Sequence, residues 1–249
     1  MPARSTMPIV GLRGSIVKFD DVDAAIAGVP FMTTKQGRLV HEFIVKNKLR
    51  RVLELGFAHG KSTCYLAAAA SELGGDAHVL TIDNLSAQDR SPNIHQLLDK
   101  CGLAEHVTPV FAKTSYTWEL MKLLERDPQP RFDFAYIDGG HTWDVTGYGF
   151  CLVDRLLAPG GWILFDDLDW TFAKSPSLSR STRVQNLPEE ERTTPQVRKV
   201  FELLVRADPR YVDVHEHAGW GWARKRRRFS RRPMRWVGGV SRRLRTRAA

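Results

Sequence analysis

The middle of the 249-residue chain alternates short apolar runs with segments of helical length. The apolar runs contain few polar residues, which is typical of strands buried on both faces of a parallel sheet. We predict five such strands, over residues 51–55, 77–82, 107–111, 132–137 and 161–165. Crossover helices fit into the segments between these strands, over residues 61–73, 93–101, 115–126 and 145–157. The alternation predicts right-handed βαβ units and therefore a doubly wound α/β fold.

Further elements are expected at both ends of this pattern. A helix is predicted over 34–48, because Thr33 and Gln36 have the spacing of a capping box. A second helix is predicted over 195–207. Two more strands are expected around a turn at 217–219, over residues 211–217 and 220–223. The complete expectation is a mostly parallel seven-stranded sheet with helices on both faces and an antiparallel last strand pair.

Composition divides the chain into three parts. We expect an N-terminal extension over 1–29, a main domain over 30–225 and a C-terminal tail over 226–249. Within the domain, residues 168–193 are polar, rich in Ser and Pro, and show no periodicity. A connection of this length inside a compact domain is typical of a lid or a binding loop. We therefore expect residues 168–193 to behave as a lid.

The formal net charge of +9 is concentrated at one end of the chain. Residues 224–249 contain twelve Lys and Arg and no Asp or Glu, which leaves 25 basic and 28 acidic side chains in residues 1–223. Any attraction to a polyanion is therefore expected of the tail alone. Three partners remain open for it, namely an anionic membrane surface, a nucleic acid, or none if the tail is a disordered, solubilising end.

Cysteine usage and hydropathy indicate a cytoplasmic protein. The three cysteines are widely spaced and form no C-x-x-C pair, which argues against a disulfide framework and a cysteine-built zinc site. The longest apolar run, over 65–70, is far shorter than the roughly 20 residues that a membrane span needs. Peripheral association with the inner membrane surface through the basic tail is compatible with this expectation.

A glycine-containing loop follows the first predicted strand. Glu54, Gly56 and Gly60 form the pattern E-x-G-x-x-x-G, which differs from the dinucleotide fingerprint G-x-G-x-x-G. Glycines allow a tight turn, and the amides of the following helix can face a phosphate or a carboxylate. Asp83 lies at the end of the second strand, where a carboxylate can accept hydrogen bonds from ribose hydroxyls. The combination favours a nucleoside ligand over a bare structural turn.

This segment resembles motif I of the class I S-adenosylmethionine-dependent methyltransferases, and the resemblance extends over most of residues 30–225. It implies that S-adenosylmethionine is the cofactor and that Asp83 holds its ribose. It further implies contacts with the cofactor's methionine end from Glu54, Gly56, Gly60 and Ser62. Other residues implied to lie at the cofactor are Thr33, Thr114, Ser115 and Asp138.

Acidic side chains follow the fourth and fifth predicted strands. Asp138 and His141 come after the fourth strand, and Asp166 and Asp167 come after the fifth. In a parallel sheet both groups lie at the carboxyl edge, where open α/β folds bind their ligands. Three carboxylates at one edge repel one another unless a cation lies between them, and an all-oxygen set suits Mg²⁺. The alternative is that these aspartates only cap turns.

The placement of these acids is similar to that in the metal-dependent small-molecule O-methyltransferases, such as catechol O-methyltransferase and the bacterial macrolide-sugar and rhamnosyl O-methyltransferases. The resemblance implies that Mg²⁺ is bound by Asp138, Asp166 and Asp167. Catechol-type enzymes carry a lysine base where this chain has His141. We therefore expect His141 and Asp138 to be the catalytic residues, with His141 accepting a proton from the acceptor hydroxyl.

The acceptor is inferred from aromatic residues near these acids. Trp143 and Trp170 are predicted to flank the pocket and to pack against a sugar or another ring, although either can instead fill the core. The fourth strand is not followed by [DN]-P-P-[YF], which weighs against methylation of an amino group. We expect O-methylation of a saccharide-like hydroxyl. A catechol-like phenol, RNA guided by the tail, a non-catalytic cofactor-binding module and a homodimer remain open.

Overall fold

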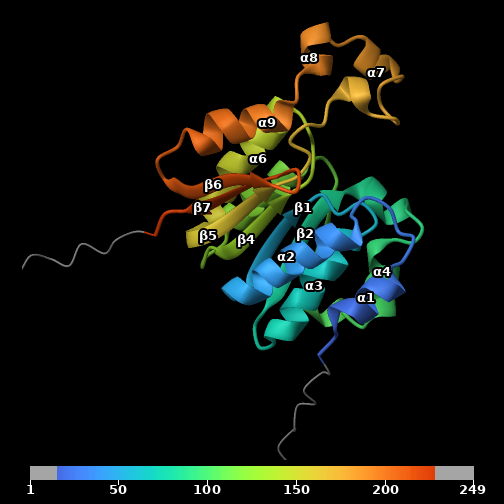
Figure 1. Cartoon of the computed structure of the whole chain (residues 1–249), viewed down its shortest axis with the longest axis vertical. Helices are drawn as coiled ribbons and strands as arrows, with labels where there is room; N and C mark the ends of the chain where they lie inside the picture. The colour runs from blue at the N-terminus through green and yellow to red at the C-terminus, as the bar shows by residue number, and fades with distance from the viewer. Residues whose placement is uncertain (1–15, 228–249) are drawn as a thin grey trace, which may run out of the picture.

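The computed structural model describes residues 16–227 and contains one seven-stranded sheet with the strand order β3-β2-β1-β4-β5-β7-β6 (Figure 1). The strands are β1 (Arg51–Leu55), β2 (His78–Asn84), β3 (Val107–Ala112), β4 (Phe132–Ile137), β5 (Leu157–Phe165), β6 (Tyr211–His217) and β7 (Trp220–Lys225). The strands β1 to β5 pair in parallel, and β7 runs antiparallel to both β5 and β6. The predicted fold class is confirmed.

Helices cover both faces of the sheet. One face is covered by α1 (Phe19–Ala25), α2 (Thr34–Asn47), α3 (Lys61–Leu73) and α4 (Ile94–Cys101). The other face is covered by α5 (Tyr116–Glu125), α6 (Trp143–Leu156), α9 (Gln196–Val200) and the π-helical turn η4 (Phe201–Arg206). In the part of the chain that the structure describes, no helix is long and apolar enough to cross a bilayer.

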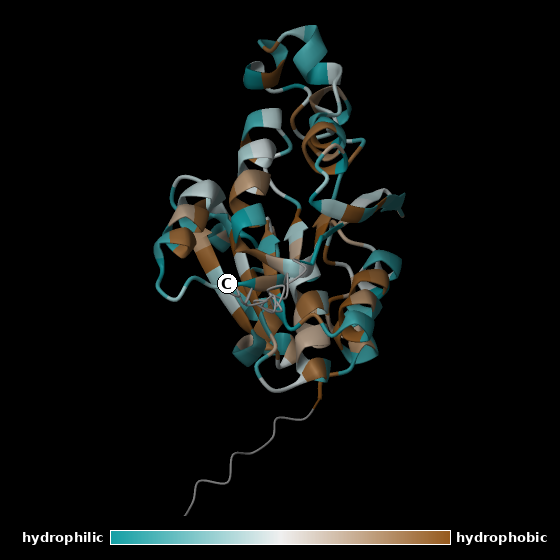
Figure 2. Cartoon of the chain, turned by 90° about the vertical axis from the view of Figure 1, so that its left-hand side faces the viewer, coloured by the Kyte–Doolittle hydropathy of each residue, from teal (hydrophilic) through white to brown (hydrophobic). Residues whose placement is uncertain are grey.

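Successive residues of the strands point to opposite faces and so build two cores. Val52 packs with the helices of the first face, whereas Leu53 packs with those of the second. Phe134 and Ala135 divide between the two cores in the same way. Figure 2 shows the apolar residues concentrated in the sheet and in the helices beside it. The nearly continuous apolar runs in the sequence follow from this burial on both sides.

The first core extends beyond the predicted start of the main domain at residue 30. Phe19, Val22 and Ile26 of α1 are buried, and the Phe19 ring stacks on Tyr65 of α3 with 5.0 Å between centroids. Residues 19–26 therefore pack as part of the domain rather than as a separate extension. The remaining part of the predicted extension, residues 1–15, lies outside the described residues.

Two predicted elements differ from the structure in their limits. Strand β5 already begins at Leu157, where the sequence suggested the end of a helix, and it contains Pro159 and Gly160. Proline and glycine disfavour strand interiors, but here they lie near an irregular register between β4 and β5. The helix predicted over 195–207 is present as α9 followed by the π-helical η4.

The segment predicted to be a lid contains three short helices: η3 (Phe172–Lys174), α7 (Thr182–Gln185) and α8 (Glu189–Thr193). The helices α7 and α8 project beyond α9 at the top of Figure 1. Short helices of four or five residues leave too little periodicity to be predicted from sequence. Whether the segment moves as a lid remains a prediction.

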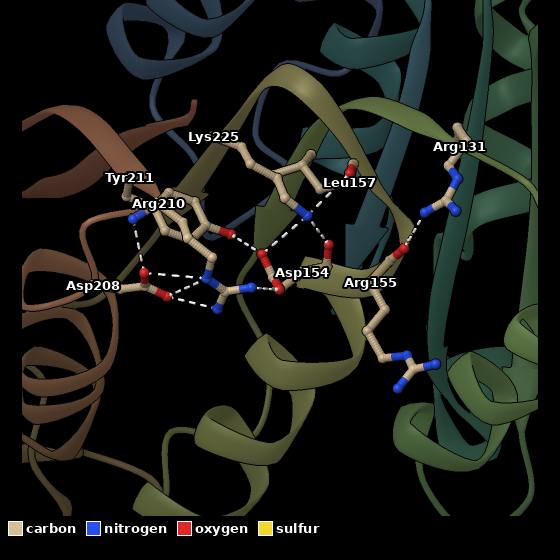
Figure 3. A network of polar contacts seen from close by, with 8 residues as sticks. All are labelled: Arg131, Asp154, Arg155, Leu157, Asp208, Arg210, Tyr211 and Lys225. Carbon is tan, nitrogen blue, oxygen red and sulfur yellow. Dashed lines mark hydrogen bonds and ion pairs between the residues drawn. The ribbon is translucent and has the colours of Figure 1, made fainter. Parts of the chain in front are cut away.

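A buried carboxylate fastens the last two strands to α6 (Figure 3). Asp154 accepts hydrogen bonds from Arg210 at 2.7 Å and from the Tyr211 hydroxyl at 2.9 Å. Lys225 Nζ lies 3.1 Å from the same carboxylate. A buried carboxylate is costly unless it is paired and hydrogen-bonded, so these partners specify where β6 and β7 dock.

Candidate active site

The strand order reverses between β1 and β4, and ligands of open α/β sheets bind at such a point. Gly56 follows β1 and Asp138 follows β4 at this crevice. A cavity of about 460 Å³ lies there, lined by the loops after β1, β2, β4 and β5 and by parts of 30–36 and 170–178. We name its two ends the glycine-loop end (residues 54–62 and Asp83) and the acidic end (Asp138, His141, Asp166 and Asp167).

Both glycines of the loop occupy positions that another residue cannot take without strain. Gly56 and Gly60 have φ values of 88° and 97°. A Cβ on Gly56 would lie 2.3 Å from the carbonyl oxygen of Asp138, and one on Gly60 would lie 2.8 Å from Ile94. Gly56 therefore allows the end of β1 to approach the end of β4. This close approach brings the two ends of the cavity together.

Asp83 orders the glycine loop. Its Oδ2 accepts hydrogen bonds from the backbone amides of Phe57 at 2.9 Å and Ala58 at 2.7 Å. Its Oδ1 accepts from the backbone amide of Asn84 at 2.7 Å. Its Oδ1 accepts a second hydrogen bond from the Asn84 side-chain amide at 2.9 Å, so the chain itself uses about all of its four acceptor sites. Asp83 also lines the cavity, and a ligand hydroxyl would replace the Asn84 side chain there. The predicted contact with ribose remains a prediction.

Glu54 lies behind the loop, completely buried and outside the cavity lining. Its Oε2 accepts hydrogen bonds from the hydroxyls of Thr63 and Thr81, both at 2.6 Å. Its Oε1 has no hydrogen-bond partner among residues 16–227. Burial raises the pKa of Glu54 to about 7, because it disfavours the charged form. Ser62, next to this carboxylate at the start of α3, does line the cavity.

The acidic end brings three potential ligand atoms close together. Asp138, His141 and Asp167 each offer one atom, and these atoms all lie within 4.8 Å of one another. His141 Nε2 lies 2.9 Å from Asp167 Oδ2 and 3.8 Å from Asp138 Oδ1. This nitrogen is buried and makes no hydrogen bond within the described chain. The histidine expected as a base therefore lies among the expected metal ligands.

Asp166 is at the same edge but is held differently from the other two aspartates. It accepts a hydrogen bond from the buried Tyr136 hydroxyl, and its Oδ1 accepts another from the backbone amide of Asp167 at 2.6 Å. Asp166 still lines the cavity. All three predicted metal ligands thus line one cavity, but Asp166 is not among the side chains whose potential ligand atoms lie together, which are Asp138, His141 and Asp167. The assignment of Asp166 as a metal ligand remains a prediction, and its hydrogen bond positions the loop after β5.

Electrostatic repulsion marks the acidic end. Burial, together with the nearby charges of Asp166 and Asp167, raises the pKa of Asp138 well above its usual range. Burial and Asp167 likewise raise the pKa of Asp166. A positive charge between these groups would relieve both the desolvation and the repulsion. Carboxylate oxygens with an adjacent imidazole therefore fit a divalent cation at this position.

The backbone at the acidic end adopts unusual conformations. His141 and Asp167 have φ values of 46° and 53°, in the left-handed region that residues with a Cβ rarely occupy. The Trp170 ring stacks on the His141 ring with 4.7 Å between centroids, and the Trp170 amide donates to the Asp167 carbonyl at 3.0 Å. Strained conformations persist where surrounding contacts enforce them, and they are common at functional sites.

Several predicted site residues do not line this cavity. Thr33 and Ser115 cap α2 and α5 through their side chains, and Thr114 lies just before Ser115. Trp143 is 43% exposed and lines a second hollow of about 520 Å³ beside Lys199 and Leu203. Trp170, by contrast, lines the main cavity. The proposed ligand contacts of Thr33, Thr114, Ser115 and Trp143 remain predictions.

Several cavity residues were not singled out from the sequence, among them Phe31, His59 and Arg90. The Phe31 side chain is 72% exposed, stacks on His59 at 5.9 Å and lies 5.8 Å from the Arg90 guanidinium. His59 lies inside the glycine pattern, so its position in the loop was a usable signal. Phe31 and Arg90 have no local motif, and only the fold brings them to the cavity.

Comparison with known proteins agrees with this arrangement. Residues 53–168, which span the glycine loop, Asp83 and the acidic end, match the family described as a methyltransferase domain. This part of the chain is a methyltransferase domain. This match, together with solved O-methyltransferases of the same fold, confirms the prediction of a class I S-adenosylmethionine-dependent methyltransferase.

The methyltransferase domain also has relatives among curated proteins and solved structures. The chain is 27% identical over 180 residues to methyltransferase str2 of Strobilurus tenacellus. The aligned residues make up 67% of this chain but only 55% of the relative. The chain thus spans about half the length of that relative. The O-methyltransferase TomG from Streptomyces achromogenes, solved with SAM, has a TM-score of 0.60 at 19% identity and covers 84% of this chain and 89% of its own.

A second solved structure has the same fold. The O-methyltransferase from Bacillus cereus in complex with SAH also has a TM-score of 0.60, at 20% identity. The match covers 84% of this chain and 90% of the Bacillus cereus chain. At these identities the structural matches establish the fold of the methyltransferase domain.

Proposed function

We propose that the protein transfers a methyl group from S-adenosylmethionine to a hydroxyl of a sugar or glycosylated metabolite, assisted by a divalent cation. The observation that carries this proposal is the single cavity of about 460 Å³ that joins the glycine-loop end to the acidic end. A methyl donor at one end and an activated hydroxyl at the other would meet in that space. Alignment of the two reactants supplies much of the catalysis in such a transfer.

The glycine-loop end has the features needed to hold the cofactor. Gly56, Ser62 and Asp83 all line this end of the cavity. Ser62 stands at the N-terminus of the 13-residue α3, and a ribose hydroxyl would bind Asp83 in place of the Asn84 side chain. A helix N-terminus favours an anionic group such as the carboxylate of the methionine moiety. The SAM and SAH complexes of TomG and the Bacillus cereus enzyme support the choice of cofactor.

The acidic end would hold the cation through Asp138 and Asp167, with Asp166 beside them. When bound, Mg²⁺ or a similar hard ion would lower the pKa of an acceptor hydroxyl and fix its position. The raised pKa values of Asp138 and Asp166 support this assignment, because a cation would stabilise the charged form of both.

His141 is the proposed proton acceptor. When bound, S-adenosylmethionine would supply an activated methyl group to the acceptor oxygen, and the electron pair of the broken carbon–sulfur bond would remain on S-adenosylhomocysteine. The hydroxyl proton passes to His141 Nε2, and the resulting imidazolium is stabilised by Asp167, whose Oδ2 lies 2.9 Å away. Stacking against Trp170 holds the ring in place for this transfer.

The acceptor class rests on Trp170 and on the acidic end together. A flat indole face packs against the apolar face of a sugar ring, while a cation binds one or two of its hydroxyls. A catechol-like phenol offers the same pair of oxygens and is the alternative acceptor. RNA guided by the tail, or a non-catalytic cofactor-binding module, are the remaining alternatives.

A mass-shift screen tests the proposal. The full chain is incubated with S-adenosylmethionine, Mg²⁺ and a panel of sugars, glycosides, catechols and RNA, with and without excess EDTA. We expect EDTA-sensitive gain of one methyl group on a sugar or glycoside and none with Asp138→Asn. Methylation of catechols alone would change the acceptor class, and full activity in EDTA would remove the cation from the mechanism.

A further inference from the structure

The edge of the sheet opposite the candidate active site carries a cluster of basic side chains. We call it the cationic edge, and it consists of Arg131, Arg155, Arg210, Lys225, Arg226 and Arg227. These residues stand where β4, β5 and β6 begin and where the antiparallel β7 ends. Arg131 donates a hydrogen bond to the Arg155 carbonyl, and the Arg226 amide donates to the Arg210 carbonyl at 2.7 Å. The cluster is therefore continuous in space.

Only part of this positive charge is balanced. Asp154 and Asp208 are paired with Arg210, and Asp154 also with Lys225, as Figure 3 shows. The other four members, Arg131, Arg155, Arg226 and Arg227, are exposed and have no ion-pair partner within residues 16–227. In Figure 3 the Arg155 guanidinium points away from the Asp154 network. Three acidic side chains lie at the same edge, namely Glu125 at the end of α5, Asp127 after it and Asp133 at the start of β4, so the excess of positive charge there is moderate.

The chain leaves the described structure from this same edge, at Arg227. Residues 228–249 add eight Arg and no acidic residue. Their sequence also places Trp236, Val240 and Leu244 at intervals of four among the arginines. Interleaved aromatic, aliphatic and basic residues are typical of segments that bind the interface of an anionic bilayer. Binding to a nucleic acid backbone would need the arginines but not the aliphatic side chains.

We propose that the cationic edge, together with the segment that follows it, docks on an anionic lipid bilayer. Parallel strands β1 to β5 run from the cationic edge toward the cavity, so the candidate active site would face away from the membrane. The acceptor would then reach the cavity from water. This inference stands apart from the proposed reaction, because it uses no residue of the cavity.

Vesicle cosedimentation with the full chain tests the proposal. The probes are vesicles of pure phosphatidylcholine and vesicles that contain 30% phosphatidylglycerol, in the same low-salt buffer. The edge variant is Arg131→Gln/Arg155→Gln. The matched control is Arg180→Gln/Arg183→Gln, which removes the same charge from the exposed segment around α7. Both variants are checked for an unchanged melting temperature, since neither pair holds buried charge.

We expect binding to the anionic vesicles alone. Because each basic residue near such a surface contributes about 1 kcal/mol, the edge variant should bind about 30-fold more weakly and the control within about twofold of the wild type. Equal binding by the edge variant and the control would overturn the role of the edge. Tighter binding to RNA than to the anionic vesicles at the same salt would overturn the lipid assignment in favour of nucleic acid.

The proposed orientation of the protein on the membrane is tested by a separate measurement. The affinity for S-adenosylhomocysteine, measured by calorimetry, should be the same with and without saturating anionic vesicles, because the cavity opens on the far edge. Loss of S-adenosylhomocysteine binding on the vesicles would contradict the proposed orientation. Failure to bind S-adenosylhomocysteine in either condition would instead count against the proposed function and leave vesicle binding as a separate result.

Discussion

The carboxylates at the two ends of the cavity differ in their hydrogen bonding. At the glycine-loop end, Asp83 accepts hydrogen bonds from the loop on Oδ2 and from Asn84 on Oδ1, and Glu54 accepts two from threonine hydroxyls. At the acidic end, Asp138 and Asp167 face each other across His141, whose Nε2 makes no hydrogen bond within the described residues. The chain itself supplies most of the hydrogen bonds that the carboxylates of the glycine-loop end can accept. It does not do so for Asp138 and Asp167 at the acidic end.

This difference indicates which carboxylates stabilise the fold and which bind a ligand. A carboxylate satisfied by backbone amides orders its own loop, as Asp83 does for residues 57 and 58. Carboxylates that mainly repel one another destabilise the fold and are retained where a cation or a substrate uses them. We therefore assign a structural contribution to the glycine-loop end and a mainly chemical one to the acidic end.

The largest effect is expected at Asp138. Asp138→Asn keeps the size of the side chain but removes a ligand charge, so Mn²⁺ affinity and methyl transfer should fall about 1000-fold. Affinity for S-adenosylhomocysteine, measured by calorimetry, should stay within about threefold if the two ends are separable. Asp76→Asn, at an exposed aspartate paired with Arg50, is the control and should change neither. Wild-type methyl transfer by Asp138→Asn would remove the acidic end from the chemistry.

Gly56 tests how closely the two ends depend on each other. In Gly56→Ala the new Cβ would meet the Asp138 carbonyl, so we expect a loss of about 3 kcal/mol in unfolding free energy and about 100-fold in S-adenosylhomocysteine affinity. Gly28→Ala is matched, with φ 81° and open space around the site, and should lose about 1–2 kcal/mol from backbone strain alone. Equal effects in urea unfolding would show that contact with β4 does not matter.

A substitution at His141 tests whether its imidazole acts as the base or as a metal ligand. His141→Asn should lower kcat about 100-fold, because the proton acceptor is lost. Mn²⁺ affinity should remain within about threefold of the wild type. A parallel loss of Mn²⁺ binding would make the imidazole a metal ligand and end its assignment as the base.

The smallest effect is expected for Glu54→Gln, in the pH dependence of the unfolding free energy. The pKa of Glu54 is raised from about 4.5 to about 7 in the folded state, so folding is favoured at low pH and loses this contribution as the pH rises to 7. Between pH 5 and 8 the loss is roughly 2 kcal/mol. Glu54→Gln cannot ionise, so its unfolding free energy in urea should change less over this range. An unchanged pH dependence in Glu54→Gln would show that Glu54 is not the titrating group.

Most of the fold could be predicted from sequence because it rests on repeated local patterns. The strands around Leu53 and Phe134 are apolar on both faces, and Thr33 and Gln36 form the predicted capping box. The start of β5 was missed because Pro159 and Gly160 disfavour strands locally while pairing with β4 favours one. The short helices of 172–193 depend on tertiary contacts rather than periodicity.

The candidate site was predictable where a motif coincides with the end of a strand. Asp83, Asp138 and Asp166 follow apolar runs, and the parallel sheet brings them to one edge. The separation of Trp143 from the cavity could not be foreseen, because its direction depends on the start of α6 and on its contact with Gln196. Phe31 and Arg90 reach the cavity from distant segments, which only the three-dimensional fold shows.

The central claim is that one cavity holds a cation at its acidic end and S-adenosylmethionine at its glycine-loop end. Anomalous diffraction at the manganese edge, from crystals grown with Mn²⁺ and S-adenosylhomocysteine, tests it most directly. We expect a manganese peak between Asp138 and Asp167, with the cofactor product along residues 56–62 in the same cavity. Bound S-adenosylhomocysteine without a manganese peak, and with the two carboxylates turned apart, would contradict it.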